Sequence, residues 1–129
     1  SSPVVAHVDG KDQILISGAN AVSGYDPDSG KPLWETTATT MATCGTLVWK
    51  DDMVFASGGY PEAGTYGIRV QGNNASVIWS NREKCYEQSM ILVGDHLYGL
   101  NYNGIMFCWN AADGKEQWKK RLSGPVSAS

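Results

Sequence analysis

Residues 24–34 read GYDPDSGKPLW, and residues 108–118 read CWNAADGKEQW. In each stretch an acidic or amide residue, Asp26 or Asn110, stands four positions before a glycine. Asp and Asn side chains cap tight turns, and glycine adopts the positive φ angle that such turns require. Each stretch ends on a tryptophan four residues after its glycine. The two stretches therefore predict the same turn, followed each time by a strand that carries a tryptophan.

The sequence around these stretches repeats three times. Trp34, Trp79 and Trp118 are 45 and 39 residues apart, close to the spacing of about 40–45 residues typical of propeller blades. Each repeat contains short apolar runs separated by turn residues, and Asn103-Gly104 is the strongest hairpin signal among them.

No segment of the chain has a convincing helical period. We therefore expect an all-β fold, a β-propeller of four-stranded antiparallel blades with three blades per chain. The approximate blades are residues 1–40, 41–83 and 84–129.

Composition excludes several classes of protein. The net charge of −3 and the lack of a basic patch argue against nucleic-acid binding. No apolar run approaches the roughly 18 residues that span a bilayer. The three cysteines, Cys44, Cys85 and Cys108, contain no C-x-x-C pair, which argues against zinc. Buried free thiols and a single disulfide such as Cys44 to Cys85 both stay open.

The two quoted stretches resemble the tryptophan-docking motif of pyrroloquinoline-quinone (PQQ) repeats, A-x-D-x-x-T-G-K-x-x-W. The middle repeat keeps only its tryptophan, with Gly72-Asn73-Asn74 as a substitute turn. The resemblance implies a structural role for the motif, with each tryptophan lying between neighbouring blades. The motif residues are Asp26, Gly30, Lys31, Trp34, Trp79, Asn110, Gly114, Lys115 and Trp118.

Two kinds of protein share this repeat, quinoprotein dehydrogenases and BamB-like proteins, and the repeat sequence here resembles that of the BamB-like proteins more closely. Quinoprotein dehydrogenases hold PQQ and calcium on the propeller axis, whereas BamB-like proteins of the bacterial envelope are non-enzymatic and bind other proteins. The resemblance thus implies a protein-interaction scaffold of the periplasm or cell envelope, with a quinoprotein fragment as the alternative. The residues available for a quinone–calcium site show no recognisable quinoprotein arrangement: Glu87, Gln88, Asp95, Arg69 and Arg82. We expect no enzyme activity and neither cofactor.

Candidate contact residues for a protein partner lie in two loops. The longest predicted loop, residues 60–66, carries two tyrosines, which would alternatively lean on the blade. A second group, residues 85–87, is expected where the inner strand of the third blade begins. The alternative to a partner contact there is a buried cysteine thiol beside a turn. The two histidines, His7 and His96, suggest no catalytic base, because no G-x-S-x-G motif accompanies them. The candidate contacts are Tyr60, Tyr66, Cys85, Tyr86 and Glu87.

Three blades do not close a ring, since propellers typically have about 4–8 blades. Residues 122–129, LSGPVSAS, lead toward a first strand like that of residues 1–8, SSPVVAHV. This register predicts a whole number of repeats. We expect either a homodimer that completes a six-bladed ring or a longer chain that supplies the other blades.

Overall fold

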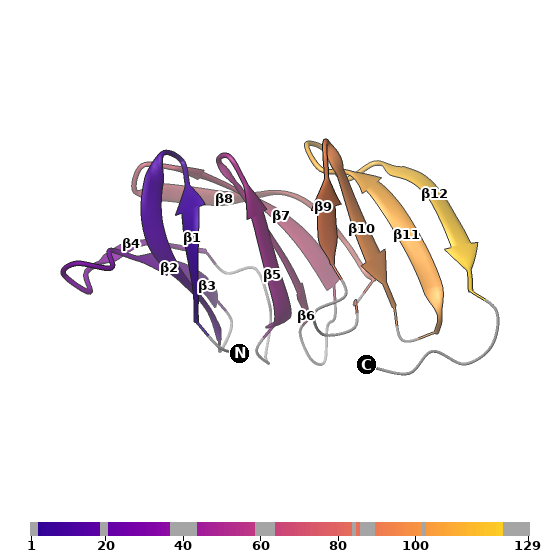
Figure 1. Ribbon diagram of the computed structural model, residues 1–129, viewed down its shortest axis with the longest axis horizontal. Coiled ribbons are helices and arrows are strands. Elements are labelled where there is room, and N and C mark those ends of the chain that lie inside the picture. The colour runs from indigo at the N-terminus through magenta and orange to yellow at the C-terminus, as the bar shows by residue number, and fades with distance from the viewer. Residues whose placement is uncertain are drawn as a thin grey trace.

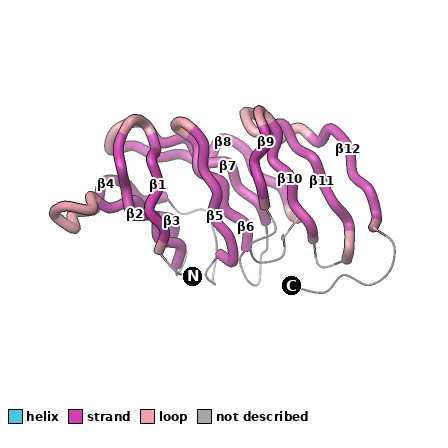
Figure 2. The backbone as a smooth tube through the Cα atoms, viewed as in Figure 1, coloured by secondary structure: helices cyan, strands magenta, loops and turns pink. Residues whose placement is uncertain are grey.

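The computed structural model describes residues 3–18, 21–36, 44–58, 64–83, 85, 90–101 and 103–122. These residues form strands and turns without any helix (Figure 2). The strands build three four-stranded antiparallel sheets that stand in a row, with the second sheet between the first and the third (Figure 1). This architecture confirms the expected all-β fold with three blades.

Each blade is a meander in which consecutive strands pair, so the chain crosses every sheet from one edge to the other. The first blade contains β1 (Val4–Val8), β2 (Lys11–Gly18), β3 (Ala21–Tyr25) and β4 (Pro32–Thr36); the second contains β5 (Cys44–Lys50), β6 (Met53–Gly58), β7 (Gly64–Gln71) and β8 (Asn74–Asn81); the third contains β9 (Ile91–Val93), β10 (His96–Leu100), β11 (Ile105–Asn110) and β12 (Glu116–Arg121).

The turn before the last strand has the same geometry in the first and third blades. Gly30 has φ 75° and donates its N–H to the Asp26 carbonyl at 2.8 Å. Gly114 has φ 76° and donates to the Asn110 carbonyl at 2.7 Å. Asp26 Oδ1 also accepts the N–H of Asp28 at 2.8 Å. In the third blade Asn110 Oδ1 accepts the N–H of Ala112 at 2.9 Å. The structure thus confirms both turns at the positions that the spacing of the motif residues predicted.

The hydrophobic core lies between blades rather than within them. One cluster packs the first blade on the second and includes Leu15, Trp34 and Ile68. A second cluster packs the second blade on the third and includes Phe55 and Leu97. All of these side chains are buried because a neighbouring sheet covers them.

Trp79 joins the second blade to the third through a close fit to two glycines. Its indole N–H donates to the Ala111 carbonyl at 2.9 Å, across the blade boundary. A Cβ added at Gly67 or at Gly114 would clash with the indole ring, so the ring lies directly over both backbones. Trp34 is also buried, but its N–H donates to Gln13 of its own blade at 2.7 Å.

We predict that Gly114→Ala destabilises the chain more than Gly30→Ala. Both substitutions place alanine at a positive φ, which costs about 1 kcal/mol. Only the alanine at Gly114 would also meet Trp79, while no described atom lies within 4 Å of a Cβ at Gly30. Overpacking of this kind adds about 1–3 kcal/mol to the loss of unfolding free energy.

Urea denaturation of both variants, followed by tryptophan fluorescence, measures the difference. Equal losses for the two substitutions would show that the contact of Trp79 with this turn does not hold the blades together.

Candidate functional site

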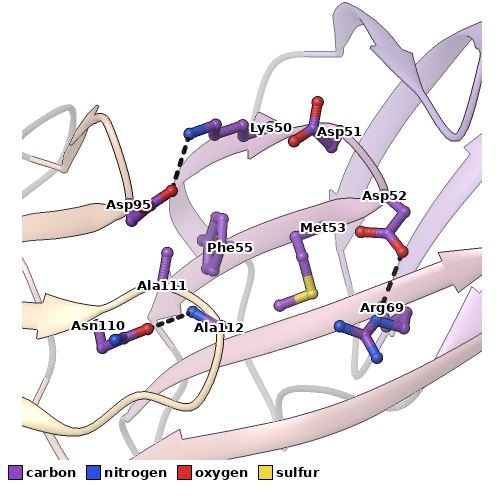
Figure 3. A pocket seen from close by; sticks show the side chains of 10 residues that line it. All are labelled: Lys50, Asp51, Asp52, Met53, Phe55, Arg69, Asp95, Asn110, Ala111 and Ala112. Carbon is purple, nitrogen blue, oxygen red and sulfur yellow. Dashed lines mark hydrogen bonds and ion pairs between the residues drawn. The ribbon is translucent and has the colours of Figure 1, made fainter.

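A pocket lies where turns of the second and third blades meet at one end of the strands (Figure 3). The β5–β6 turn approaches the β9–β10 turn there, and the β11–β12 turn closes the third side. The volume is about 330 Å³. The lining residues are Lys50, Asp51, Asp52, Met53, Phe55, Arg69, Asp95, Asn110, Ala111 and Ala112.

The floor of this pocket is apolar and fixed. Met53, Phe55 and Ala111 are all buried, and they belong to the core cluster between the second and third blades. Ala111 is held from both sides, because its N–H donates to the Asp95 carbonyl at 2.9 Å and its carbonyl accepts the Trp79 indole N–H. The same contact that joins the two blades therefore shapes the pocket floor.

The rim carries charges of both signs. The Lys50 ammonium donates to the Gly94 carbonyl at 2.5 Å and lies 3.5 Å from the Asp95 carboxylate. Arg69 Nε lies 3.5 Å from Asp52 Oδ2, and that buried nitrogen makes no hydrogen bond with any described residue. Figure 3 shows these two ion pairs on opposite sides of the pocket. A floor for an apolar side chain and a rim with polar groups suit a segment of polypeptide.

A second, more open hollow of about 550 Å³ lies beside the first, between the turns of the first two blades. His7, Asp9, Gly10, Asp51 and Asp52 line it. Asp9 bridges the blades there, since its N–H donates to the Asp51 carbonyl and its carboxylate accepts the Gly72 N–H, both at 2.8 Å. Within the described residues no group of three His, Cys, Asp or Glu side chains is placed to hold a metal ion.

Of the five predicted contact residues, the structure describes Tyr66 and Cys85, and neither lines this pocket. Tyr60, Tyr86 and Glu87 fall outside the described residues. Tyr66 was expected in a loop, but it lies within β7, half-buried against the core between the first two blades. Cys85 pairs with Asn101 just past the end of β10, whereas the pocket lies at the start of that strand.

The residues weighed for a quinone–calcium site are only partly described. Arg69 and Asp95 line the pocket, on opposite sides of it (Figure 3). Arg82 is exposed just after β8, and residues 87 and 88 are outside the described part of the chain. His7, which belongs to neither set, lies with its Nδ1 within hydrogen-bond distance, 2.9 Å, of Asp12 Oδ1. The described residues of this set thus do not converge on one point.

Cys85 belongs to a buried polar cluster that joins the second blade to the third at the end opposite the pocket. Its N–H donates to Ser57 Oγ at 2.8 Å, and its sulfur lies 3.8 Å from Thr65 Oγ1. Ser57 and Thr65 are hydrogen-bonded to each other at 2.9 Å, and Thr65 also donates to the Glu83 carbonyl at 2.5 Å.

The Cys85 thiol is free, while the side chain of Cys44, the partner that the sequence left open, lies outside the part of the chain that the structure describes. Burial raises the pKa of this thiol above its ordinary value, because the thiolate would lose its hydration. The sulfur is therefore a protonated, structural group at neutral pH.

Neither the pocket nor the polar cluster is readable from the sequence, because each is assembled from two blades. The pocket joins residues 50–55 to residues 110–112, and no local pattern indicates that the two segments meet. Arg69, Asp95 and Asn110 were candidates for other roles, and no local pattern indicated that they line one pocket.

Comparison with known proteins agrees with this fold. A family model for PQQ repeats, described as outer membrane protein assembly factor BamB, matches residues 1–127. The crystal structure of BamB from Moraxella catarrhalis is similar, with a TM-score of 0.67 at 14% sequence identity. The match covers 92% of this chain and 36% of the BamB chain, so the chain spans little more than a third of that length. No curated protein matches the chain.

We predict that Cys85 reacts slowly with a disulfide reagent such as DTNB in the folded protein. In a Cys44→Ser, Cys108→Ala background, the native reaction at neutral pH should be at least about tenfold slower than in the unfolded chain, since both burial and the raised pKa suppress the thiolate. Ser76→Cys, an added thiol at an exposed position of β8, serves as control and should react at nearly the unfolded rate. A fast native reaction of Cys85 would contradict the buried site.

Proposed function

Because the chain belongs to the PQQ-repeat family described as outer membrane protein assembly factor BamB, we propose that it is a non-enzymatic scaffold that binds other proteins. The observation that carries the proposal is the pocket between the second and third blades. Its buried apolar floor and charged rim provide the two kinds of contact that a polypeptide partner needs.

The chemistry of the pocket lining supports binding rather than catalysis. The ten lining residues contain no serine, cysteine or histidine. Two of the charged side chains, Lys50 and Arg69, face carboxylates within the pocket rim. Each of these two pairs is neutral, and Asp51 adds one further negative charge to the lining. The result is an amphipathic hollow, which suits a bound side chain flanked by polar backbone.

The alternative is a piece of a quinoprotein oxidoreductase that uses PQQ and calcium. Such a site needs oxygen ligands for calcium and cations for the quinone carboxylates, close together near the propeller axis. Of the described members of that set, Arg69 and Asp95 lie on opposite sides of the pocket and Arg82 does not line it, which favours the scaffold.

The proposed setting is the cell envelope, by analogy with the printed description of the matching family. We further propose that the blades are part of a closed propeller, completed by a second copy of the chain or by the remainder of a longer chain. The 36% coverage of the similar BamB chain supports a larger ring. No helix in the described residues is long and apolar enough to cross a membrane.

We predict that filling the pocket abolishes peptide binding. Ala112 is exposed at the pocket mouth, so Ala112→Trp blocks it without touching the core. Asp28→Trp is the matched control, because Asp28 occupies the equivalent turn position in the first blade. Peptides selected from a random phage library against the unmodified chain should bind the Asp28→Trp variant normally and the Ala112→Trp variant at least about tenfold more weakly.

Equal binding to both variants, or no selected peptide at all, would contradict a peptide-binding role for this pocket.

We also predict that PQQ with calcium does not bind the chain. Titration of PQQ and calcium chloride into the protein should leave the quinone absorbance equal to that of a protein-free control. A saturable shift in that absorbance would support the quinoprotein alternative instead.

A further inference from the structure

The pocket and the second hollow lie on either side of one turn. Asp51 and Asp52, in the turn between β5 and β6, line both of them. The N–H of Asp9 donates to the Asp51 carbonyl at 2.8 Å, which holds the β1–β2 turn against the β5–β6 turn. Both hollows lie between blades that the structure describes, so neither depends on the faces at the two ends of the row. They are therefore adjacent parts of one surface.

The pocket offers a place for an apolar side chain and a donor for the backbone beside it. Its floor consists of the buried residues Met53, Phe55 and Ala111. At its edge Asn110 Oδ1 accepts the Ala112 N–H, so the amide nitrogen of Asn110 is left as a donor that no described residue uses (Figure 3). An apolar floor with a polar donor at its edge suits a side chain whose own peptide carbonyl needs a partner.

The second hollow carries negative charge that no described cation balances. Asp9 and Asp51 both line it, and both are exposed. The Asp9 carboxylate accepts the Gly72 N–H at 2.8 Å, but neither carboxylate forms an ion pair with a lysine or arginine of the described residues. His7 is the one basic side chain among the described residues of this lining, and its Nδ1 lies 2.9 Å from Asp12 instead.

The cations that line the neighbouring pocket face other carboxylates. Lys50 Nζ lies 3.5 Å from Asp95 Oδ1, and Arg69 Nε lies 3.5 Å from Asp52 Oδ2. The two carboxylates of the second hollow are therefore left without a counter-charge. The surface as a whole combines a nearly neutral, apolar part with an adjacent acidic part.

We propose that this surface binds a segment of a partner protein in which a lysine or arginine lies close in sequence to an apolar residue. The apolar side chain occupies the pocket, and the basic side chain lies in the second hollow between Asp9 and Asp51. Charge complementarity selects this occupant, because an acidic segment would be repelled by both carboxylates. A free cation would leave the apolar floor uncovered. This inference rests on the proposed scaffold role and names the chemistry of the segment that the scaffold binds.

A double variant, Asp9→Asn with Asp51→Asn, removes the proposed charge and keeps both turns. Asparagine at position 9 retains an oxygen that can accept the Gly72 N–H, and asparagine tolerates the φ of 53° at position 51. Asp28→Asn is the matched control, because Asp28 is exposed on another turn and lines neither hollow. Circular dichroism verifies that both proteins fold.

The probe is a peptide selected from a random phage library against the unmodified chain. We expect the selected peptides to share a basic residue close to an apolar one. The tightest peptide is synthesised in its selected form and in two altered forms. In one the basic residue is replaced by glutamine, and in the other the apolar residue is replaced by alanine. Fluorescence anisotropy gives the affinity of each form for the unmodified chain and for both variants.

The unmodified chain and Asp28→Asn should bind the glutamine form at least about fivefold more weakly than the selected form. The double variant should bind these two forms within about twofold of each other, because the carboxylates that distinguish them are gone. The alanine form should bind weakly to all three proteins, since each keeps the apolar floor. Equal discrimination by the double variant and the unmodified chain would overturn the inference.

Selected peptides that share no basic residue would also overturn this inference, and they would leave the scaffold role intact. Ala112→Trp tests the scaffold role separately, because it blocks the pocket and keeps both carboxylates of the second hollow. A chain that selects no peptide would overturn the inference and the peptide-binding role together.

Discussion

Each sheet of this protein can bury its faces only against another sheet, and the rest of the structure follows from that constraint. The middle blade shows the effect most clearly, since all six residues of β6 are buried. At the end of the row Trp118 is 44% exposed on β12, whereas Trp34 and Trp79, at the equivalent position of the other two blades, are buried. Position in the row therefore decides burial as much as residue type does. The Trp79 contact with the Gly114 turn is the point at which two blades are held in register.

The fold was predictable from the sequence because its signals are local. The Asp26 and Asn110 turns depend on side chains and glycines within five residues of one another, so their spacing alone specifies them. The middle blade departs from the motif and still makes its turn, since Gly72 supplies a positive φ of 60°. Antiparallel meanders with short turns leave few possible strand orders. Because one sequence pattern occurs three times, three four-stranded blades could be predicted.

The candidate site was not predictable, because it depends on side chains that meet only after blades pack. The pocket joins the β5–β6 turn to the β11–β12 turn, and the sequence carries no signal of that meeting. Tyr66 was misplaced for a different reason. Residues 60–66 were predicted to form one loop, but β7 pairs with β6 as far as Gly64, and the Thr65 hydroxyl is hydrogen-bonded to the Ser57 hydroxyl. Cross-strand pairing thus extended a strand beyond the point that composition indicated.

The blades are connected in a line, and the connections between them differ in kind. The first is joined to the second at its turns by Asp9, while the second is joined to the third by Lys50, by Trp79 and by the Cys85 cluster. A mechanical load applied to the two outermost sheets would pass through these junctions in series. The weakest junction between two blades would then separate first, so that one blade detaches while the other two stay packed together. A row of this kind separates between its sheets under tension, because each junction combines an apolar cluster with a few polar contacts at the turns.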